Sequence, residues 1–320
     1  MTTAETVPVF RVADRLRLAR TLTWLEAGDP RGLDQVGLGA QPARAHVVGV
    51  TGAPGTGKST LTSSLVGLLR ARRATVAVLA VDPSSPLSGG ALLGDRLRMS
   101  DHLHDPGVYI RSVASRGQGG GLALVVPSAI RALDNYGFDW ILVESVGVGQ
   151  VELDIADHAD TTVLVVCPGN GDEVQASKAG VIEVADVIAV NKADQGGAQG
   201  VADDYRIALD LSARSGWRVP IHCCSARDGR AVESVLDAIY GHARHSAATG
   251  QLEHRRATRR RVLLREAVKT LSAERAYARL LRDEPGVVQD VARGVIDPLT
   301  AARLFVSATE PTSTDTTARR

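Results

Sequence analysis

The residues best suited to chemistry are Gly52-Ala53-Pro54-Gly55-Thr56-Gly57-Lys58-Ser59, followed by a second hydroxyl, Thr60. They fit the phosphate-loop pattern G-x-x-x-x-G-K-[ST] without a mismatch. The glycines of such a loop let backbone N–H groups turn toward a phosphate, and the following helix N-terminus adds partial positive charge. We expect Lys58 to reach the β- and γ-phosphates and the Ser59 hydroxyl to bind Mg²⁺. The segment therefore predicts a nucleoside polyphosphate site.

The segments on either side of this loop support the assignment. Residues 46–50 form an apolar run typical of a strand, and Leu61, Leu65, Leu68 and Leu69 form the apolar stripe of a helix. A glycine-rich turn between a strand and a helix also arises by chance in α/β proteins. The complete motif with both flanks favours the phosphate loop.

A second motif is Asn191-Lys192-Ala193-Asp194, which follows the apolar run 187–190. An N-K-x-D sequence at a strand end matches the guanine-reading motif of G proteins. Guanine presents two donors, N1–H and the exocyclic amine, and the carboxylate of Asp194 can accept both, whereas adenine presents an acceptor at N1. We expect Lys192 to lie over the base and Asn191 to brace the loop. Alone the motif is weak, but its place after a phosphate loop predicts GTP and GDP rather than adenine nucleotides.

A third short element follows the last apolar run and is Ser225-Ala226-Arg227. It is similar to the S-A-x element whose backbone amides support the guanine O6. Three residues prove little alone, but their order along the chain agrees with a guanine site.

Acidic residues that could hold Mg²⁺ stand at or just beyond the ends of predicted strands. Glu144 ends the run 140–143 and occupies the position where most G proteins carry D-x-x-G, with Gly147 placed to approach the γ-phosphate. Asp82 ends the second run, and Asp95 follows a Ser/Gly-rich segment. Each acid taken singly could be a helix cap or a surface carboxylate. Their clustering predicts metal or switch acids, with Lys58, Asp95, Glu144 and Gly147 acting in hydrolysis.

The residue after Gly147 is Val148, which cannot orient an attacking water, and Gln150 stands two positions too late for that role. The sequence therefore predicts slow GTP hydrolysis that a partner accelerates.

Seven apolar runs rich in β-branched residues alternate with helix-length segments between residues 46 and 245. They span 47–50, 76–81, 108–113, 140–143, 162–167, 187–190 and 219–223. This alternation predicts an α/β fold, a P-loop NTPase domain over 46–245 with a mostly parallel sheet flanked by helices. Ligands of such sheets bind at the carboxyl ends of the strands, where all the motifs fall.

Helical segments are predicted on both sides of this domain. An N-terminal helical extension covers 1–45, with a stripe that ends at Gly28-Asp29-Pro30 and a looser stretch after it. A C-terminal helical arm covers 246–306, where 251–282 form one long helix or a helical pair, Pro285-Gly286 breaks it and Asp297-Pro298 opens a further helix. Residues 307–320 are predicted to be a disordered tail.

Composition restricts the function classes. A formal charge of +1 argues against a general polyanion binder, and an aromatic content of 3% argues against a base-stacking nucleic-acid platform. We expect no nucleic-acid partner. The chain also lacks an apolar stretch long enough for a bilayer and an N-terminal apolar signal region, so we expect no membrane partner.

The chain has three cysteines, Cys167, Cys223 and Cys224. An odd number with two adjacent does not indicate a disulfide framework, so we expect a reducing, cytoplasmic environment. His222 and Cys224 share one strand face, but two ligands are fewer than structural zinc needs, so strand packing is the favoured interpretation.

An arginine cluster marks the long C-terminal helix and consists of Arg255, Arg256, Arg259, Arg260, Arg261 and Arg265. We expect a solvated helix face; an acidic partner or a CoA phosphate is the alternative. The apolar Val262, Leu263 and Leu271 of the same helix lead to the hypothesis of a homodimer.

Four segments together resemble the MeaB/ArgK family, the GTPase chaperones of adenosylcobalamin-dependent methylmalonyl-CoA mutase. They are residues 81–96, 116–122, 144–150 and 191–194, and the resemblance runs from about Arg17 to about Val306. The first segment is highly specific. One departure is Ser145, which stands where the family usually has Thr and keeps the hydroxyl.

The resemblance implies a dimeric GTPase of the SIMIBI class with an N-terminal helical extension and a C-terminal dimerisation arm. It implies that Lys58 and Ser59 hold phosphate and Mg²⁺, and that Asp82, Asp95 and Glu144 are metal or switch acids. Residues 172–178 resemble the family's additional switch segment. The implied role is to gate adenosylcobalamin loading and to protect or rescue methylmalonyl-CoA mutase or a related acyl-CoA mutase.

Two other functions stay open. A nickel-insertion GTPase for hydrogenase or urease shares the fold class, but a His-rich tract or a Cys/His metal site is expected there. An ATP-dependent kinase of amino-acid-transport binding proteins is an older interpretation of this family, and Asp194 argues against it.

Overall fold

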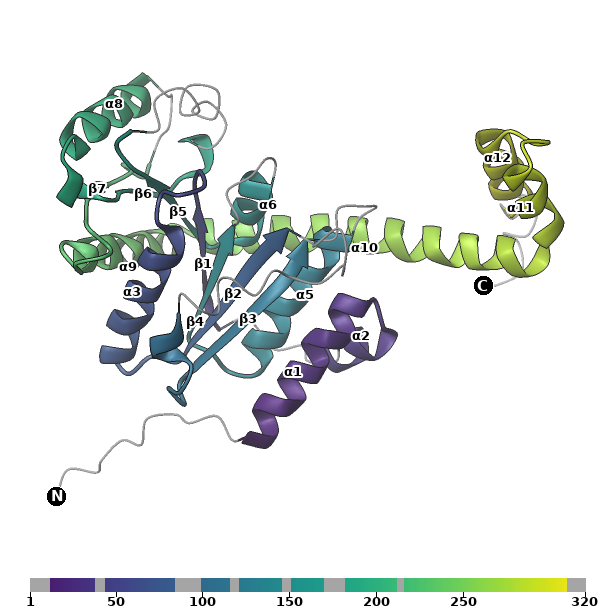
Figure 1. The fold of residues 1–320 in the computed structure, drawn as a ribbon, viewed down its shortest axis with the longest axis horizontal. Helices are drawn as coiled ribbons and strands as arrows, with labels where there is room; N and C mark the ends of the chain where they lie inside the picture. Colours follow the sequence, from purple (N-terminus) through teal and green to yellow (C-terminus); the bar gives the residue numbers. More distant parts are fainter. Residues whose placement is uncertain are drawn as a thin grey trace. The chain divides into compact units, whose positions relative to one another are not determined.

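The sheet is the centre of the fold. A computed structural model of the chain describes residues 12–37, 44–83, 99–115, 121–145, 151–169, 182–211 and 216–309. Its strands are β1 (His46–Thr51), β2 (Val76–Pro83), β3 (Val108–Ser115), β4 (Trp140–Ser145), β5 (Thr161–Val166), β6 (Val187–Val190) and β7 (Ile221–Cys223). They pair in parallel in the order β3-β2-β4-β1-β5-β6-β7 (Figure 1). The predicted parallel sheet is confirmed, with β1 at its centre.

All seven predicted runs form strands, and β7 is shorter than its predicted run. The predicted run began at Val219, but the strand begins at Ile221. Pro220 lacks an N–H and cannot donate to a ladder. Its carbonyl still accepts a hydrogen bond from the Ile188 N–H at 3.0 Å. The proline therefore shortens the strand without removing the chain from the sheet edge.

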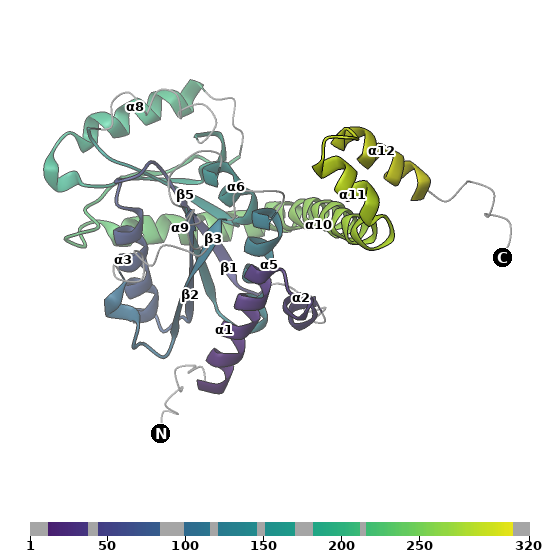
Figure 2. The ribbon, with the colours of Figure 1, turned by 45° about the vertical axis from the view of Figure 1, so that its right-hand side comes forward.

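Helices cover both faces of the sheet, as Figures 1 and 2 show. On one face α3 (Lys58–Ala71) and α9 (Val232–Ala248) pack on Val48 and Val50 of β1. The opposite face carries Val47, over which α1 (Val12–Ala27) and α5 (Gly121–Asn135) share a core. The other helices of this layer are α6 (Val151–His158) and α8 (Ala198–Leu211). Strands buried on both faces explain why the runs read as continuously apolar.

The N-terminal extension contains two helices, although the sequence predicted only one. The predicted stripe of α1 packs in the core through Leu18, Leu22 and Leu25, while Leu16 is 57% exposed. The stretch after Asp29 was predicted to be irregular, but it forms α2 (Pro30–Gly37). A proline suits a first helical position, where no N–H partner is needed. Pro30, which suggested a loop in the sequence, is therefore the first residue of α2.

The C-terminal region is helical throughout the described residues. The segment predicted to be one long helix or a helical pair is one continuous helix, α10 (Gln251–Asp283). Two further helices follow it, α11 (Pro285–Ala292) and α12 (Pro298–Thr309). The last helix continues three residues beyond the predicted end of the arm at 306; residues 310–320 lie outside the described part. The chain divides into two compact units, Met1–Leu263 and Leu264–Arg320.

The solvated-face prediction is wrong for three of the six clustered arginines. Arg256 donates to Asp160 Oδ2 at 2.6 Å and Arg259 also pairs with Asp160, which is 1% exposed. Arg255 makes a bidentate pair with Asp186, both bonds at 2.8 Å. These two aspartates directly precede β5 and β6. The ion pairs therefore hold the start of α10 at the amino-terminal ends of these strands. Breaking a buried pair of this kind typically costs about 3–5 kcal/mol.

Acid is expected to destabilise the first unit through His46 and His158. Burial lowers the pKa of each imidazole from 6.5 to about 4. Both are therefore neutral when folded and take up a proton on unfolding. Their contribution to stability is complete above pH 6.5 and is lost as pH falls toward about 4, by up to about 3 kcal/mol for each group.

Denaturant midpoints between pH 7.5 and 4.5 measure this loss. Replacing the buried imidazole in His158→Leu is expected to make the decline shallower. An unchanged pH slope in this variant would refute the assignment.

Candidate phosphate and guanine site

The phosphate loop connects β1 to the N-terminus of α3. Gly52 follows β1, with φ 138°, and a Cβ there would lie 2.1 Å from Val165 O of the neighbouring strand β5. Gly57 has φ 91° and precedes the first residue of α3. Between these two glycines the chain holds Pro54 and Gly55 exposed. The loop therefore presents its backbone at a helix N-terminus, which suits an anionic ligand.

Lys58 places its ammonium inside this loop. The side chain starts at the first residue of α3 and is 7% exposed. Its Nζ donates hydrogen bonds to Gly52 O at 2.7 Å and to Ala53 O at 3.0 Å. A positive charge held against the loop backbone complements a phosphate seated in the same loop.

Ser59 and Glu144 come together from two elements. Ser59 Oγ donates to Glu144 Oε1 at 2.5 Å, and both residues are buried. They meet because β4 pairs with β1, which places Glu144 beside Val50 at the end of the strand that leads into the loop. A hydroxyl and a carboxylate are oxygen ligands of the kind that Mg²⁺ prefers, so the pair fits this ion.

The other predicted acids are described only in part. Val81 pairs with Ser145, so the backbone of Asp82 reaches the same carboxyl edge as Glu144, and nothing further is described of its side chain. Asp95 and Gly147 lie outside the described residues. The same holds for Val148 and Gln150 and for the predicted switch segment 172–178.

Asn191 joins the loops that carry the three motifs. Its Nδ2 donates to Thr56 O in the phosphate loop at 2.9 Å, and its Oδ1 accepts from the Ala226 N–H at 2.9 Å. The Asn191 N–H also donates to Val166 O at the end of β5 at 2.7 Å. One buried amide therefore connects the phosphate loop to the predicted base-reading loops.

The residues predicted to face the base surround this amide. Lys192 adopts a left-handed conformation, with φ 59°, and leads into the short helix η2 (Ala193–Gln195), where Asp194 is exposed. Ser225 is buried and Arg227 is exposed in the loop after β7. Three sequence motifs whose first residues are 34 to 173 residues apart therefore converge at one edge of the sheet.

Two further residues shape the loop after β7 and were missed at the sequence level. Asp228 Oδ2 accepts a hydrogen bond from Ser225 Oγ at 3.0 Å. Ser64 Oγ of α3 donates to Ala226 O at 2.9 Å. Neither residue belongs to a recognisable motif, and only the approach of α3 to this loop reveals them.

Cys223 and Cys224 act as packing residues, and His222 of β7 pairs with Ala189 of β6. Cys224 is buried in the core beneath α3 and α9, and Cys223 packs on the core beneath α8. Across the described part of the chain, no three His, Cys, Asp or Glu side chains gather in a metal-binding arrangement. The packing of Cys223 and Cys224 agrees with the strand-packing interpretation.

Gly57→Ala is expected to disrupt the site. A Cβ at this position would lie 2.3 Å from Asn191 Nδ2, and the positive φ adds backbone strain. We expect GTP affinity to fall by about 5- to 150-fold, because the cost of strain and displacement is about 1–3 kcal/mol. The matched control is Gly137→Ala, which has φ 87° and no atom within 4 Å of its Cβ. Titration with a fluorescent GTP analogue measures both variants, and equal losses would refute the role of the Asn191 contact.

The protein-family model described as "Methylmalonyl Co-A mutase-associated GTPase MeaB" matches residues 18–280. The chain belongs to the MeaB family. A GTPase of Pyrococcus abyssi is 40% identical over 94% of this chain and 95% of its own length. GTPase ArgK of Escherichia coli is 35% identical, covering 79% of each chain. The resemblance seen in the sequence motifs is therefore confirmed.

A solved structure shares the fold of this MeaB-family chain. The crystal structure of an LAO/AO transport system kinase superposes with a TM-score of 0.64 at 24% identity, covering 95% of this chain and all of that one. The chain is a P-loop GTPase, and membership of the family implies that it binds guanine nucleotides. Within the described residues, no helix combines the length and apolar character that crossing a bilayer requires.

Proposed function

We propose that this MeaB-family protein is a GTP-dependent chaperone of an adenosylcobalamin-dependent acyl-CoA mutase. Methylmalonyl-CoA mutase is the first candidate client. The observation that carries the proposal is the match of residues 18–280 to a family described as associated with that mutase. The chaperone gates loading of the cofactor and protects or reactivates the mutase, and its bound nucleotide sets which state it is in.

The roles of the site residues are part of this proposal. Residues 52–60 hold the phosphates, with Lys58 on the β- and γ-phosphates. Asn191, Lys192 and Asp194 position the guanine together with Ser225, Ala226 and Arg227. The convergence of these loops on Asn191 supports this arrangement.

Ser59 and Glu144, with Asp82 and Asp95, are the proposed residues for Mg²⁺, which when bound neutralises charge on the phosphate oxygens. The 2.5 Å contact between the Ser59 hydroxyl and the Glu144 carboxylate supports a shared role for this pair. Gly147 is proposed to contact the γ-phosphate through its N–H.

Hydrolysis by the protein alone is expected to be slow because Val148 follows Gly147. We expect a turnover far below the roughly ten per second of a fully activated G protein. Phosphate release under single-turnover conditions measures the rate. A comparable rate without any partner would contradict this expectation.

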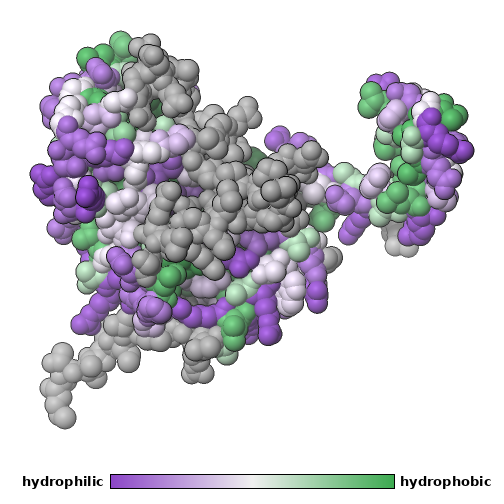
Figure 3. Space-filling model, in the orientation of Figure 1, coloured by the Kyte–Doolittle hydropathy of each residue, from purple (hydrophilic) through white to green (hydrophobic). Residues whose placement is uncertain are grey.

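A homodimer is the proposed assembly, with a G domain over residues 46–245 and a dimerisation arm over 246–306. In the unit Leu264–Arg320, the large apolar residues Val268, Leu271, Tyr277, Leu281, Leu299 and Leu304 are exposed. The first four of these residues lie on α10 and the last two on α12, and Figure 3 shows further apolar atoms, in green, over α11 and α12. Exposed apolar side chains at this density favour a partner surface. A strictly monomeric mass at high concentration would refute the dimer.

One alternative has an observation in its favour. The solved structure with the same fold carries the name LAO/AO transport system kinase, which suggests an ATP-dependent kinase. Competition between ATP and GTP for the nucleotide site distinguishes the kinase from the GTP-dependent chaperone, and a preference for ATP would favour the kinase. The nickel-insertion alternative has no support from the described side chains.

Binding to candidate mutases tests the proposal. The protein is immobilised and offered purified methylmalonyl-CoA mutase with GDP or with a non-hydrolysable GTP analogue. We expect binding whose strength depends on the nucleotide, and a mutase that does not use cobalamin serves as the control. Failure to bind any cobalamin-dependent mutase in either state would overturn the chaperone assignment.

A further inference from the structure

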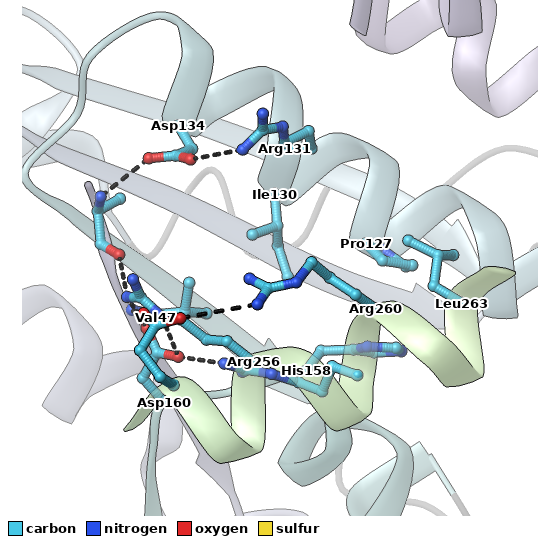
Figure 4. Close-up of a pocket in the computed structure, with 13 residues that line it drawn as sticks. Val47, Pro127, Ile130, Arg131, Asp134, His158, Asp160, Arg256, Arg260 and Leu263 are labelled. Carbon is cyan, nitrogen blue, oxygen red and sulfur yellow. Dashed lines mark hydrogen bonds and ion pairs between the residues drawn. The ribbon is translucent and has the colours of Figure 1, made fainter. Parts of the chain in front are cut away.

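A pocket of about 660 Å³ lies between α5, the first turns of α10 and the start of β1 (Figure 4). Its volume falls within the range of about 300–1,000 Å³ that is typical of small-molecule sites. The pocket is separate from the phosphate loop. Val47 lines it, and β1 reaches the loop only after Thr51, about 13 Å further along the strand at 3.3 Å per residue.

Much of the pocket wall is apolar. Figure 4 shows Pro127 of α5 near Leu263 of α10, and Ile130 of α5 and Val47 of β1 line the same pocket. An apolar wall of this kind favours a ligand with an aliphatic body over a small hydrated ion.

The charged lining has an excess of positive charge. Four arginines and three carboxylates line the pocket: Arg131, Arg256, Arg259, Arg260, Asp134, Asp160 and Glu253. His158 adds no charge at neutral pH, because burial lowers the pKa of its imidazole to about 4. Four positive charges against three negative charges leave one positive charge for a ligand to neutralise.

Two of the carboxylates already have ion-pair or hydrogen-bond partners within the protein. Asp160 is held by two arginines of α10. Asp134 Oδ1 accepts hydrogen bonds from the backbone N–H groups of Arg44 and Ala45, both at 2.9 Å. Both carboxylates therefore have partners within the protein that offset their negative charge, and Asp134 also pairs with Arg131.

Arg260 is the lining cation that is most available to a ligand. Its ion pair with Glu253 is long, at 3.6 Å, and the two side chains are 62% and 71% exposed. An exposed ion pair at this distance contributes little to stability, so Arg260 can readily exchange Glu253 for a bound anion. The His158 imidazole also lines the pocket and adds a neutral polar group.

We propose that this pocket binds a small organic anion with an aliphatic body. The carboxylate or phosphate pairs with Arg260, and the body packs on Pro127, Ile130 and Leu263. This site is additional to the nucleotide site, and the inference does not depend on the proposed chaperone function.

Calorimetric titration of the full chain with matched probes tests the class of ligand. Octanoate and octyl phosphate share one aliphatic body and distinguish a carboxylate from a phosphate, whereas octylammonium reverses the charge. We expect saturable binding of at least one anion and much weaker binding of the cation. Absence of saturable binding by both anions, or equal binding of the cation, would overturn the proposal.

Substitutions then locate the bound anion. Arg260→Gln is expected to weaken binding about tenfold or more, because a charge-assisted contact is lost. Ile130→Trp fills the pocket and is expected to abolish binding. If Ile130→Trp does not fold, Arg260→Gln alone decides the test, because it changes an exposed side chain. Arg261→Gln is the matched control, since this neighbouring arginine is exposed and does not line the pocket. Anion binding that both Arg260→Gln and Ile130→Trp leave unchanged would overturn the assignment.

Discussion

Replacing Lys58 by alanine is expected to reduce GTP hydrolysis by about 10²–10³-fold, the usual loss when one preorganised donor to a transition state is removed. The ammonium lies within the phosphate loop, bonded to Gly52 O and Ala53 O, and its side chain is nearly fully buried. A γ-phosphate in the loop would exchange a neutral carbonyl partner for an anionic one, which strengthens the interaction. Phosphate release measured at saturating GTP gives the rate.

The controls for this variant separate chemistry from folding. Lys58→Met keeps most of the aliphatic stem and loses only the charge, so it is expected to be as defective as Lys58→Ala. Lys269→Ala removes an exposed lysine of α10 and is expected to hydrolyse GTP at the normal rate. Hydrolysis within a few-fold of normal in both Lys58 variants would show that the loop does not act on the phosphate.

Asp194→Asn is expected to change which base the site accepts. The carboxylate of Asp194 is proposed to accept two donors of guanine, and each charge-assisted hydrogen bond is worth about 1.5–3 kcal/mol. The loss of GTP affinity is therefore expected to be about 10²–10⁴-fold. Xanthine carries an oxygen where guanine carries its amine, so the new amide N–H₂ can donate to it and XTP affinity is expected to rise.

Exposure of Asp194 makes this result easy to interpret, because the substitution disturbs no core contact. The matched control is Asp203→Asn, an exposed aspartate of α8 that pairs with Arg206. Titrations with GTP, XTP and ATP measure all three affinities. If the variant keeps its GTP affinity, or if GTP and XTP affinities fall together, Asp194 does not read the base.

Local patterns in the sequence predicted most of the fold. Residues 52–59 are a continuous motif, and the strands buried on both faces appear as short apolar runs that need no long-range information. The exceptions are local conflicts. Pro30 suggested a loop but begins α2, and Pro220 shortens a strand that otherwise has the right composition.

Contacts between distant residues could not be predicted in this way. The amide of Asn191 meets Thr56 across 135 residues, and no spacing rule encodes that approach. Arg256 pairs with Asp160 although both look like ordinary surface residues in the sequence. A charged stripe on a helix is usually solvated, and only the fold shows which carboxylates lie beneath it. The proposed roles of the site residues thus come from motifs, while their mutual positions come from the sheet.

Cofactor loading tests the central claim most directly. Apo methylmalonyl-CoA mutase is mixed with adenosylcobalamin and this protein, in the presence of GTP, GDP or a non-hydrolysable GTP analogue, and cofactor uptake is followed by its absorbance. We expect the rate or extent of loading to depend on the nucleotide, and Lys58→Ala to remove the difference between GTP and its analogue. Loading that is identical with and without the protein, whatever the nucleotide, would contradict the proposal.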